Sequence, residues 1–399
     1  MIGKELIDLI FKAFSVERWN DKLRPIPLMQ MDKHAHKMML TYVLGRYEED
    51  CGNEFSWRDI IRGGIYELIR RSVISDIQSP VYREIAKNEA LLHKLNYMIY
   101  KEVESKLPND IIRKEFERYL LDDSFLHPHS KKILEAAHKY SSYWEFQIIR
   151  NANPNGYSIS DIEIMMGNDI EKLSELEGIR RLKKKHNIKN FVDLCGELRY
   201  QLRWGHLQRI PQTSVLGHLM MVASITYFLS LELEDLTDER LYNNFYCAIF
   251  HDLPEVVTRD IIKPVKISVP GMREEIQKIE KQLAEEEIHP HIRKVWVEEI
   301  KYFTQDEFAY KTKNAKYNTF KEFKEKIKTE ESPLDGPLIK AADDFSAFLE
   351  AYNSINYGIR SSELEQAMKS IAYKYKNSNI SGIDISKLFE VYNVIDKDN

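Results

Sequence analysis

Apolar residues recur at spacings of three and four along most of this 399-residue chain. That spacing places them on one face of an α-helix, because a helix turns once every 3.6 residues. Clear examples are Leu216–Leu233, Glu274–Glu287 and Leu338–Tyr352. No series of segments alternates apolar and polar residues, and the sequence holds only 15 glycines and 13 prolines. The pattern therefore predicts an all-α protein built as a helical bundle.

Turn-forming residues gather in one place near the middle of the chain, at Asn151–Gly156 (NANPNG). Such a cluster ends helices and is typical of a boundary between structural units. We therefore expect a first helical domain over residues 1–155, a connection over 156–190 and a second domain over 191–399. The segment at about 270–330 is highly charged with a helical pattern, and we interpret it as an insertion in the second domain.

Similar short segments occur in the same order in both halves of the chain, which favours a tandem duplication. The alternative is that helical proteins repeat apolar patterns in general. In this pairing Ser75 replaces His251 and His138 replaces Asp343, so the first copy is predicted to be degenerate. The paired segments are Arg18-Trp19 with Arg203-Trp204, His36–Leu40 with His218–Val222, Ser75–Ile85 with His251–Ile261, and Ile133–Glu145 with Leu338–Glu350.

Charge and cysteine content exclude several classes of protein. Lys and Arg total 58 against 63 Asp and Glu, a formal net charge of -5 that does not fit a general nucleic-acid-binding protein. The three cysteines, Cys51, Cys195 and Cys247, are too few and too widely spaced for a disulfide framework or a CxxC zinc site. The amino-terminal segment mixes charged with apolar residues and predicts an amphipathic helix rather than a signal peptide. We therefore expect a cytoplasmic protein that does not enter a membrane.

Histidine and aspartate residues with metal-binding chemistry lie in three of the predicted helices of the second half. His251 and Asp252 follow the apolar run FYCAIF, His218 lies in an earlier helix, and Asp343 lies in a later one. Adjacent residues on a helix project about 100° apart, so His251 and Asp252 can approach one ion if the helix passes beside it. Two imidazoles and two carboxylates suit a divalent ion such as manganese, cobalt, iron, nickel or magnesium.

The order His, His-Asp, Asp resembles the HD-domain metal-dependent phosphohydrolases. More closely, the sequence is similar to bacterial HD-domain 5′-nucleotidases that act on deoxyribonucleoside monophosphates. The resemblance covers about Leu202–Pro264 and Leu338–Ala351, and departs from the family at Gly217, where an acidic residue is common. The matching residues are Arg203, Trp204, Thr213, Val215, His218, His251, Asp252, Glu255, Thr258, Asp260, Pro264–Lys266 and Lys340–Ala347.

The resemblance implies a role for each of these site residues. It implies that the metal ligands are His218, His251, Asp252 and Asp343, with Asp343 preferred to Asp344 because it directly follows Ala341-Ala342. It also implies that Arg203 contacts the substrate phosphate, with Trp204 beside it and Thr258 and Asp260 as further substrate-binding residues. Glu255 and Asp252 are the implied catalytic residues, Glu255 handling the water. Pro254 leaves open whether the helix continues as far as Glu255.

The function predicted from these residues is removal of phosphate from a nucleotide, most simply a nucleoside 5′-monophosphate. One alternative is a regulatory HD protein that binds a nucleotide without hydrolysing it. Another is hydrolysis of a nucleoside triphosphate or a pyrophosphate, for which Lys263 and Lys266 offer extra positive charge. The expected partner is thus a small phosphate ester, and the two copies are expected to pack together as a pseudo-dimer within one chain.

Overall fold

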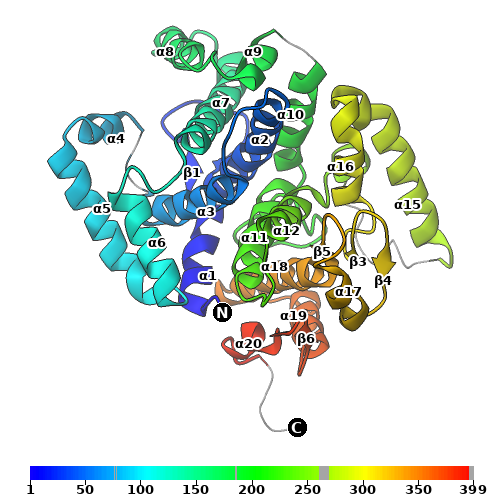
Figure 1. Ribbon diagram of the computed structural model, residues 1–399. Helices are drawn as coiled ribbons and strands as arrows, with labels where there is room; N and C mark the ends of the chain where they lie inside the picture. The colour runs from blue at the N-terminus through cyan, green and yellow to red at the C-terminus, as the bar shows by residue number, and fades with distance from the viewer. Residues whose placement is uncertain (76, 78, 185–186, 260–268, 395–399) are drawn as a thin grey trace.

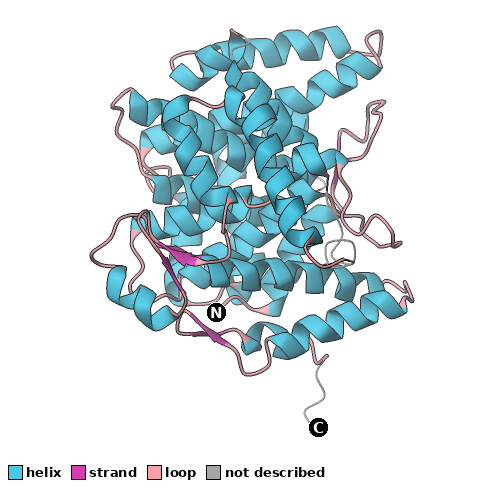
Figure 2. Cartoon of the chain, turned by 90° about the vertical axis from the view of Figure 1, so that its right-hand side faces the viewer, coloured by secondary structure: helices cyan, strands magenta, loops and turns pink. Residues whose placement is uncertain are grey.

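The computed structural model describes residues 1–75, 77, 79–184, 187–259 and 269–394. Helices make up the body of the molecule, and the strands of the described residues are only two residues long (Figure 1, Figure 2). This confirms the all-α fold predicted from the apolar spacing. The helices in chain order are α1 (Lys4–Phe11), α2 (Gln30–Asp50), α3 (Trp57–Val73), α4 (Ser79–Ala86), α5 (Glu89–Val103), α6 (Asp110–Leu121), α7 (Pro128–Ala152), α8 (Ile159–Glu171), α9 (Glu177–Lys183), α10 (Asn187–Glu197), α11 (Val215–Ser230), α12 (Asp238–Phe250), α13 (Glu255–Thr258), α15 (Met272–Leu283), α16 (Lys294–Thr304), α17 (Phe320–Lys326), α18 (Gly336–Asn356), α19 (Ser362–Lys374) and α20 (Ser386–Glu390).

Two long helices from opposite halves of the chain, α2 and α11, pack against each other at the centre of the molecule. Every residue of α11 is buried, and so are most residues of α2. Helices α3 and α7 pack on α2, whereas α12 and α18 pack on α11 (Figure 1). Apolar side chains of both halves, such as Leu40 and Met220, belong to one hydrophobic cluster. The two halves therefore share a continuous core, and each stabilises the other by burying apolar surface.

Specific polar contacts fix where the helices of the second half begin. The side chain of Ser214 accepts a hydrogen bond from the backbone N–H of Gly217 at 2.9 Å, which caps the start of α11. Just before α18, the carboxylate of Asp335 accepts two hydrogen bonds from the guanidinium of Arg240, each 2.7 Å long. Arg240 lies in the first turn of α12, so this buried pair sets the start of α18 against α12.

The segment predicted as a charged insertion contains strands as well as helices. Helix α16 packs on α12, and β3 (Tyr310–Lys311) pairs with both β4 (Lys316–Tyr317) and β5 (Leu334–Asp335). Because β5 runs directly into α18, this small sheet connects the segment to the helix that carries Asp343. The remaining strand pairs are β1 (Glu17–Arg18) with β2 (Leu28–Met29), and β6 (Asn379–Ile380) with β7 (Ile383–Asp384).

The amino-terminal segment forms α1, whose apolar residues are buried in the core. Within the described residues, no helix combines the length and the apolar character that crossing a membrane requires.

Candidate metal centre

Three of the four predicted ligands come together at the end of α12. His218 lies in the second turn of α11, while His251 and Asp252 directly follow the last residue of α12. One ligand atom from each of the three lies within 4.8 Å of the others. The rings of His218 and His251 are 6.2 Å apart, centroid to centroid. This spacing lets one ion contact both imidazoles and the carboxylate of Asp252.

The ring of His251 is held by its Nδ1 atom, which lies 2.9 Å from the carbonyl oxygen of Ala248. Its Nε2 atom is buried and makes no hydrogen bond within the described part of the chain, although Asp252 Oδ2 lies 3.3 Å away. A buried nitrogen without a partner costs free energy unless something outside the chain satisfies it. A divalent cation bound to Nε2 and to Asp252 fits this arrangement.

The ring of His218 is held in the same way, with Nδ1 bound to protein groups and Nε2 toward the centre. Nδ1 lies 3.0 Å from Ser346 Oγ and 3.2 Å from Glu350 Oε1, while Nε2 lies 2.9 Å from Asp343 Oδ1. Histidines that bind metals usually donate their second ring N–H to a carboxylate or carbonyl, which orients the ring. Glu350 takes that position here and was missed from the sequence, although its match with Glu145 in the internal repeat was a usable signal.

The two adjacent aspartates of α18 face different surroundings. Asp343 contacts His218 and also the ammonium of Lys340, at 2.5 Å. Asp344 also lies 2.9 Å from Lys340, but it accepts hydrogen bonds from Lys374 and from the hydroxyl of Tyr375 at the end of α19. Asp343 contacts His218, but it is not one of the three residues whose ligand atoms all lie within 4.8 Å of one another.

Charges in this centre oppose the effect of burial. Burial disfavours the charged form of His251, but the carboxylates of Asp252 and Asp343 outweigh it and raise its pKa to about 9. Burial likewise disfavours charge on Asp343, but Lys340 and His218 outweigh it and hold the pKa of this carboxyl well below its usual range. Burial also disfavours charge on Asp252, but His251 outweighs it and lowers the pKa of this carboxyl. Both carboxylates are therefore ionised at neutral pH, as metal ligands must be.

Arg203 and Trp204, which were predicted to bind substrate, both contact the carboxylate of Glu350, and this carboxylate also contacts His218. Glu350 Oε2 lies 3.3 Å from Arg203 Nε and accepts a hydrogen bond from Trp204 Nε1 at 2.7 Å. The backbone N–H of Arg203 donates to Thr213, which fixes this loop beside the start of α11. Trp204 adopts a left-handed backbone conformation with φ of 57°. Glu350 therefore links the predicted phosphate-binding arginine to a predicted metal ligand.

Helix α12 ends before the predicted catalytic glutamate. It stops at Phe250, and Glu255 is the first residue of the short helix α13, after Pro254. The side chain of Glu255 is buried, and its carbonyl accepts a hydrogen bond from Gln201. Thr258, the last residue of α13, donates to the carbonyl of Pro254 at 3.3 Å. Asp260, Lys263 and Lys266 lie outside the described residues.

The first half contains the same arrangement around Glu145. Glu145 Oε2 lies 2.9 Å from Arg18 Nε and accepts from Trp19 Nε1 at 3.1 Å, and Trp19 has a φ of 55°. Lys33 follows Arg18 by 15 residues (33 − 18), as His218 follows Arg203 (218 − 203). Lys33 Nζ lies 2.7 Å from Nδ1 of His138, which stands seven residues before Glu145 (145 − 138), as Asp343 stands before Glu350 (350 − 343).

His36, which the sequence comparison paired with His218, lies elsewhere. Its Nε2 atom is 3.0 Å from the carbonyl oxygen of Val192, and its ring packs edge-on against Trp144. The structure thus places Lys33, one turn earlier in α2, in contact with His138. The apolar pattern Met-Met in both helices favoured the other pairing. A hydrogen bond of 3.1 Å from Arg18 to Gln30, the first residue of α2, connects this helix to the Arg18–Glu145 pair.

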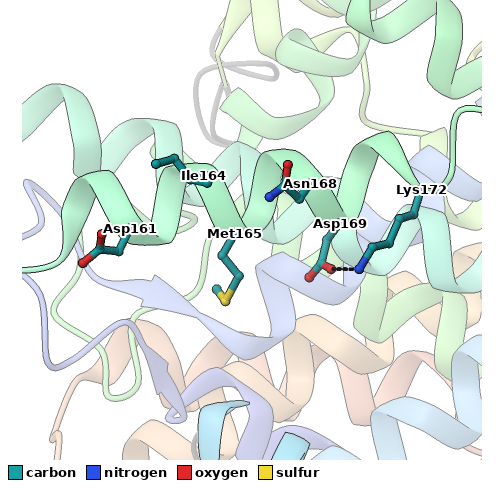
Figure 3. A pocket seen from close by; sticks show the side chains of 6 residues that line it. All are labelled: Asp161, Ile164, Met165, Asn168, Asp169 and Lys172. Atoms are coloured by element: carbon teal, nitrogen blue, oxygen red, sulfur yellow. Dashed lines mark ion pairs between the residues drawn. The ribbon is translucent and has the colours of Figure 1, made fainter.

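A surface hollow outside this centre lies on α8 and is shown in Figure 3. Its lining includes Asp161, Met165 and Lys172, with an ion pair of 3.9 Å between Asp169 and Lys172. It contains none of the predicted site residues and no histidine or arginine. The hollow is therefore separate from the centre at His218 and His251.

Comparison with known families agrees with the geometry of this centre. Residues 195–372 match the family model described as the HD domain, and this segment includes His218, His251, Asp252 and Asp343. That part of the chain is therefore similar to the HD domain, a class whose members are in general metal-dependent phosphohydrolases. No curated protein matches the chain.

Gly217, which stands where the nucleotidase pattern commonly has an acidic residue, has a packing explanation. A Cβ atom there would lie 2.7 Å from Asp32 Oδ1 and 2.8 Å from the ring of Phe14. Asp32 belongs to α2 and accepts a hydrogen bond of 2.6 Å from Ser214, the capping residue of α11. A side chain at position 217 would displace this contact, so the departure results from the packing of α2 on α11.

Proposed function

We propose that this protein removes the phosphate from a nucleoside 5′-monophosphate with the help of a divalent metal ion. The observation that carries the proposal is the meeting of His218, His251 and Asp252, with the buried Nε2 of His251 left without a hydrogen bond in the described part of the chain. We assign the ion to these three residues and Asp343. A divalent ion held there lowers the pKa of a bound water and neutralises charge on a phosphate group.

The protein's own side chains account for the other requirements of the reaction. Arg203 is 14% exposed and held beside His218 by Glu350, so its guanidinium can bind the substrate phosphate. Glu255 is assigned to accept the proton of the attacking water. Lys340, already in contact with Asp343, adds a second positive charge beside the centre. Trp204, Thr258 and Asp260 are assigned to the remainder of the substrate.

We further propose that residues 1–155 are a degenerate copy of the domain at 191–399, joined to it by residues 156–190. The matching contacts of Glu145 and Glu350 support this, because they involve an arginine and a left-handed tryptophan in each half. Packing of α2 on α11 supports an intramolecular pseudo-dimer. With Lys33 in the position of His218, the first copy is not expected to hold a metal or to hydrolyse a phosphate ester.

The test is a phosphate-release assay on protein freed of metal by chelation and reloaded separately with manganese, cobalt, iron, nickel or magnesium. Nucleoside mono-, di- and triphosphates are compared as substrates. Monophosphates are expected to be hydrolysed fastest, and Asp252→Ala is expected to lose both bound metal and activity. Full metal occupancy in the Asp252→Ala protein would overturn the metal assignment. Release from triphosphates alone would overturn the monophosphate assignment.

A further inference from the structure

A second group of buried charged side chains lies in the first half, around Lys33 of α2. The side chain of Lys33 is completely buried, and its Nζ atom is 2.7 Å from Nδ1 of His138. In the described part of the chain, no carboxylate lies within ion-pair distance of this nitrogen. Burying an ammonium without a negative partner costs several kcal/mol, so Lys33 occupies a site that favours an anion.

One carboxylate serves most of the neighbouring cations. Glu67 of α3 lies 3.2 Å from Lys37 Nζ, 3.2 Å from His138 Nδ1 and 3.6 Å from Arg71 Nε. Burial disfavours charge on Glu67, but Lys37 and His138 outweigh it and hold its pKa well below the usual range. Glu67 is therefore shared among several cations and, within the described residues, forms no ion pair with Lys33.

The state of Arg71 and Lys33 points the same way. The Nε atom of Arg71 is buried and makes no hydrogen bond within the described residues, and the carboxylate of Glu67 lies 3.6 Å from it. Burial, and then the positive charge of Arg18, lower the pKa of Lys33 well below its usual range. A weakly paired guanidinium and a lysine held back from its charged form are both relieved when an anion enters.

Part of this group is exposed to solvent. The side chains of Arg18 and Arg71 are each 17% exposed and that of His138 is 30% exposed, whereas Lys33, in contact with His138, is completely buried. An anion from solvent would thus meet the two guanidinium groups before it met the nitrogen of Lys33. Arginine forks and lysine together are a typical environment for a phosphate group.

We infer that Arg18, Lys33 and Arg71 form a second site, which binds a phosphate group without hydrolysing it. The site goes beyond the proposed activity, because it uses none of the residues assigned to the metal. In the proposed duplication, Lys33 stands at the position of His218, so a positive side chain lies where the second half would hold a metal ion. The ligand is either free phosphate or the phosphate of a nucleotide, and the experiment below compares the two.

The experiment uses the full-length chain with Asp252→Ala and no metal, so that the metal centre cannot bind phosphate through an ion. Inorganic phosphate and adenosine 5′-monophosphate are titrated separately by calorimetry. We expect one site per chain, with affinity reduced at least 10-fold by adding Lys33→Met. Adding Arg203→Ala instead should leave this binding unchanged, which separates the new site from the predicted substrate site.

Lys132→Met is the matched control, because Lys132 lies on α7 near His138 in sequence but pairs with Glu175 at the surface. It should bind phosphate as the parent does. Lys33→Met should not lower the melting temperature, since an apolar side chain replaces a buried charge without a counterion. If it does unfold the chain, Arg71→Gln at the rim replaces it, and the same 10-fold loss is expected.

The inference is overturned if the parent binds neither ligand at millimolar concentration. It is equally overturned if Lys33→Met, or Arg71→Gln where needed, leaves the affinity unchanged. Tighter binding of the nucleotide than of phosphate would identify a nucleotide as the ligand, whereas equal affinities would identify free phosphate. Because these titrations use metal-free protein, their result is independent of whether the metal-loaded enzyme hydrolyses nucleotides.

Discussion

The carboxylate of Glu350 lies 3.2 Å from Nδ1 of His218, and both side chains are completely buried. The same carboxylate contacts Arg203 and Trp204. Burial disfavours its charge, but Arg203 and then Arg209 outweigh that effect and hold its pKa well below the usual range. An ionised Glu350 fixes the orientation of His218 and makes its Nε2 atom a better metal ligand. In the proposed function, metal binding by His218 and phosphate binding by Arg203 are therefore linked through one side chain.

Glu350→Gln is expected to weaken metal affinity by about 10–100-fold, because the amide is uncharged and holds His218 less firmly. The measurement is a metal titration followed by elemental analysis. Glu145→Gln is the matched control, since Glu145 makes the same contacts with Arg18 and Trp19 away from the metal centre. Equal metal affinities in the two variants would contradict the role assigned to Glu350.

Substitutions of Arg203 should distinguish its contact with Glu350 from its proposed binding of the substrate phosphate. Arg203→Ala is expected to reduce kcat/KM by about 100-fold or more and to weaken metal binding slightly, because Glu350 loses one of its cations. Arg203→Lys keeps the charge near Glu350 but lacks the bidentate fork, so metal affinity should recover while kcat/KM remains low. Steady-state kinetics and metal titration on both variants check this. Normal kinetics in Arg203→Ala would refute phosphate binding by this residue.

The adjacent aspartates of α18 should behave differently. Asp343→Ala removes the carboxylate in contact with His218 and is expected to reduce bound metal and hydrolysis strongly. Asp344→Ala should keep its metal and instead lower the melting temperature, because Lys374 and Tyr375 lose a partner. Metal content and thermal unfolding of the two variants distinguish these roles. If Asp344→Ala lost its metal and Asp343→Ala kept it, Asp344 and not Asp343 would be the metal ligand.

The sequence was sufficient for the helical class, because that class depends on local spacing. The three residues that meet at the centre, His218, His251 and Asp252, were predicted from the resemblance to the HD-domain phosphohydrolases. Long α11 and α18 follow directly from their apolar periodicity. Glu350 was not predicted, since its importance depends on contacts with Arg203 and His218 more than 130 residues away in the chain. Lys33 was missed for the same reason, because the Met-Met pattern of α2 could not reveal which turn of the helix approaches His138.

Asp32 provides a test of how α2 supports the metal-binding helix. Burial, against the opposing effects of Arg199 and of the hydrogen bond from Ser214, raises its pKa to about 6 from an ordinary value of 3.8. Between these pH values the folded protein retains a proton that the unfolded chain has lost. Stability contributed by this group is therefore complete below pH 3.8 and is lost as the pH rises through about 6.

Asp32→Asn should remove this pH dependence while keeping an oxygen that accepts the hydrogen bond from Ser214. A shift of about 2 pH units corresponds to about 3 kcal/mol, so the variant should exceed the parent in unfolding free energy at pH 7 by up to that amount. At pH 4 the carboxyl of Asp32 is protonated in the folded parent. The advantage of the variant in unfolding free energy should therefore be smaller there than at pH 7, by about 3 kcal/mol at most. Urea denaturation at both pH values measures it, with the exposed Asp161→Asn on α8 expected to change stability by less than about 0.5 kcal/mol. A variant that is less stable than the parent at pH 7 would show that Asp32 stabilises the helix contact as a carboxylate, contrary to the cost that its burial predicts.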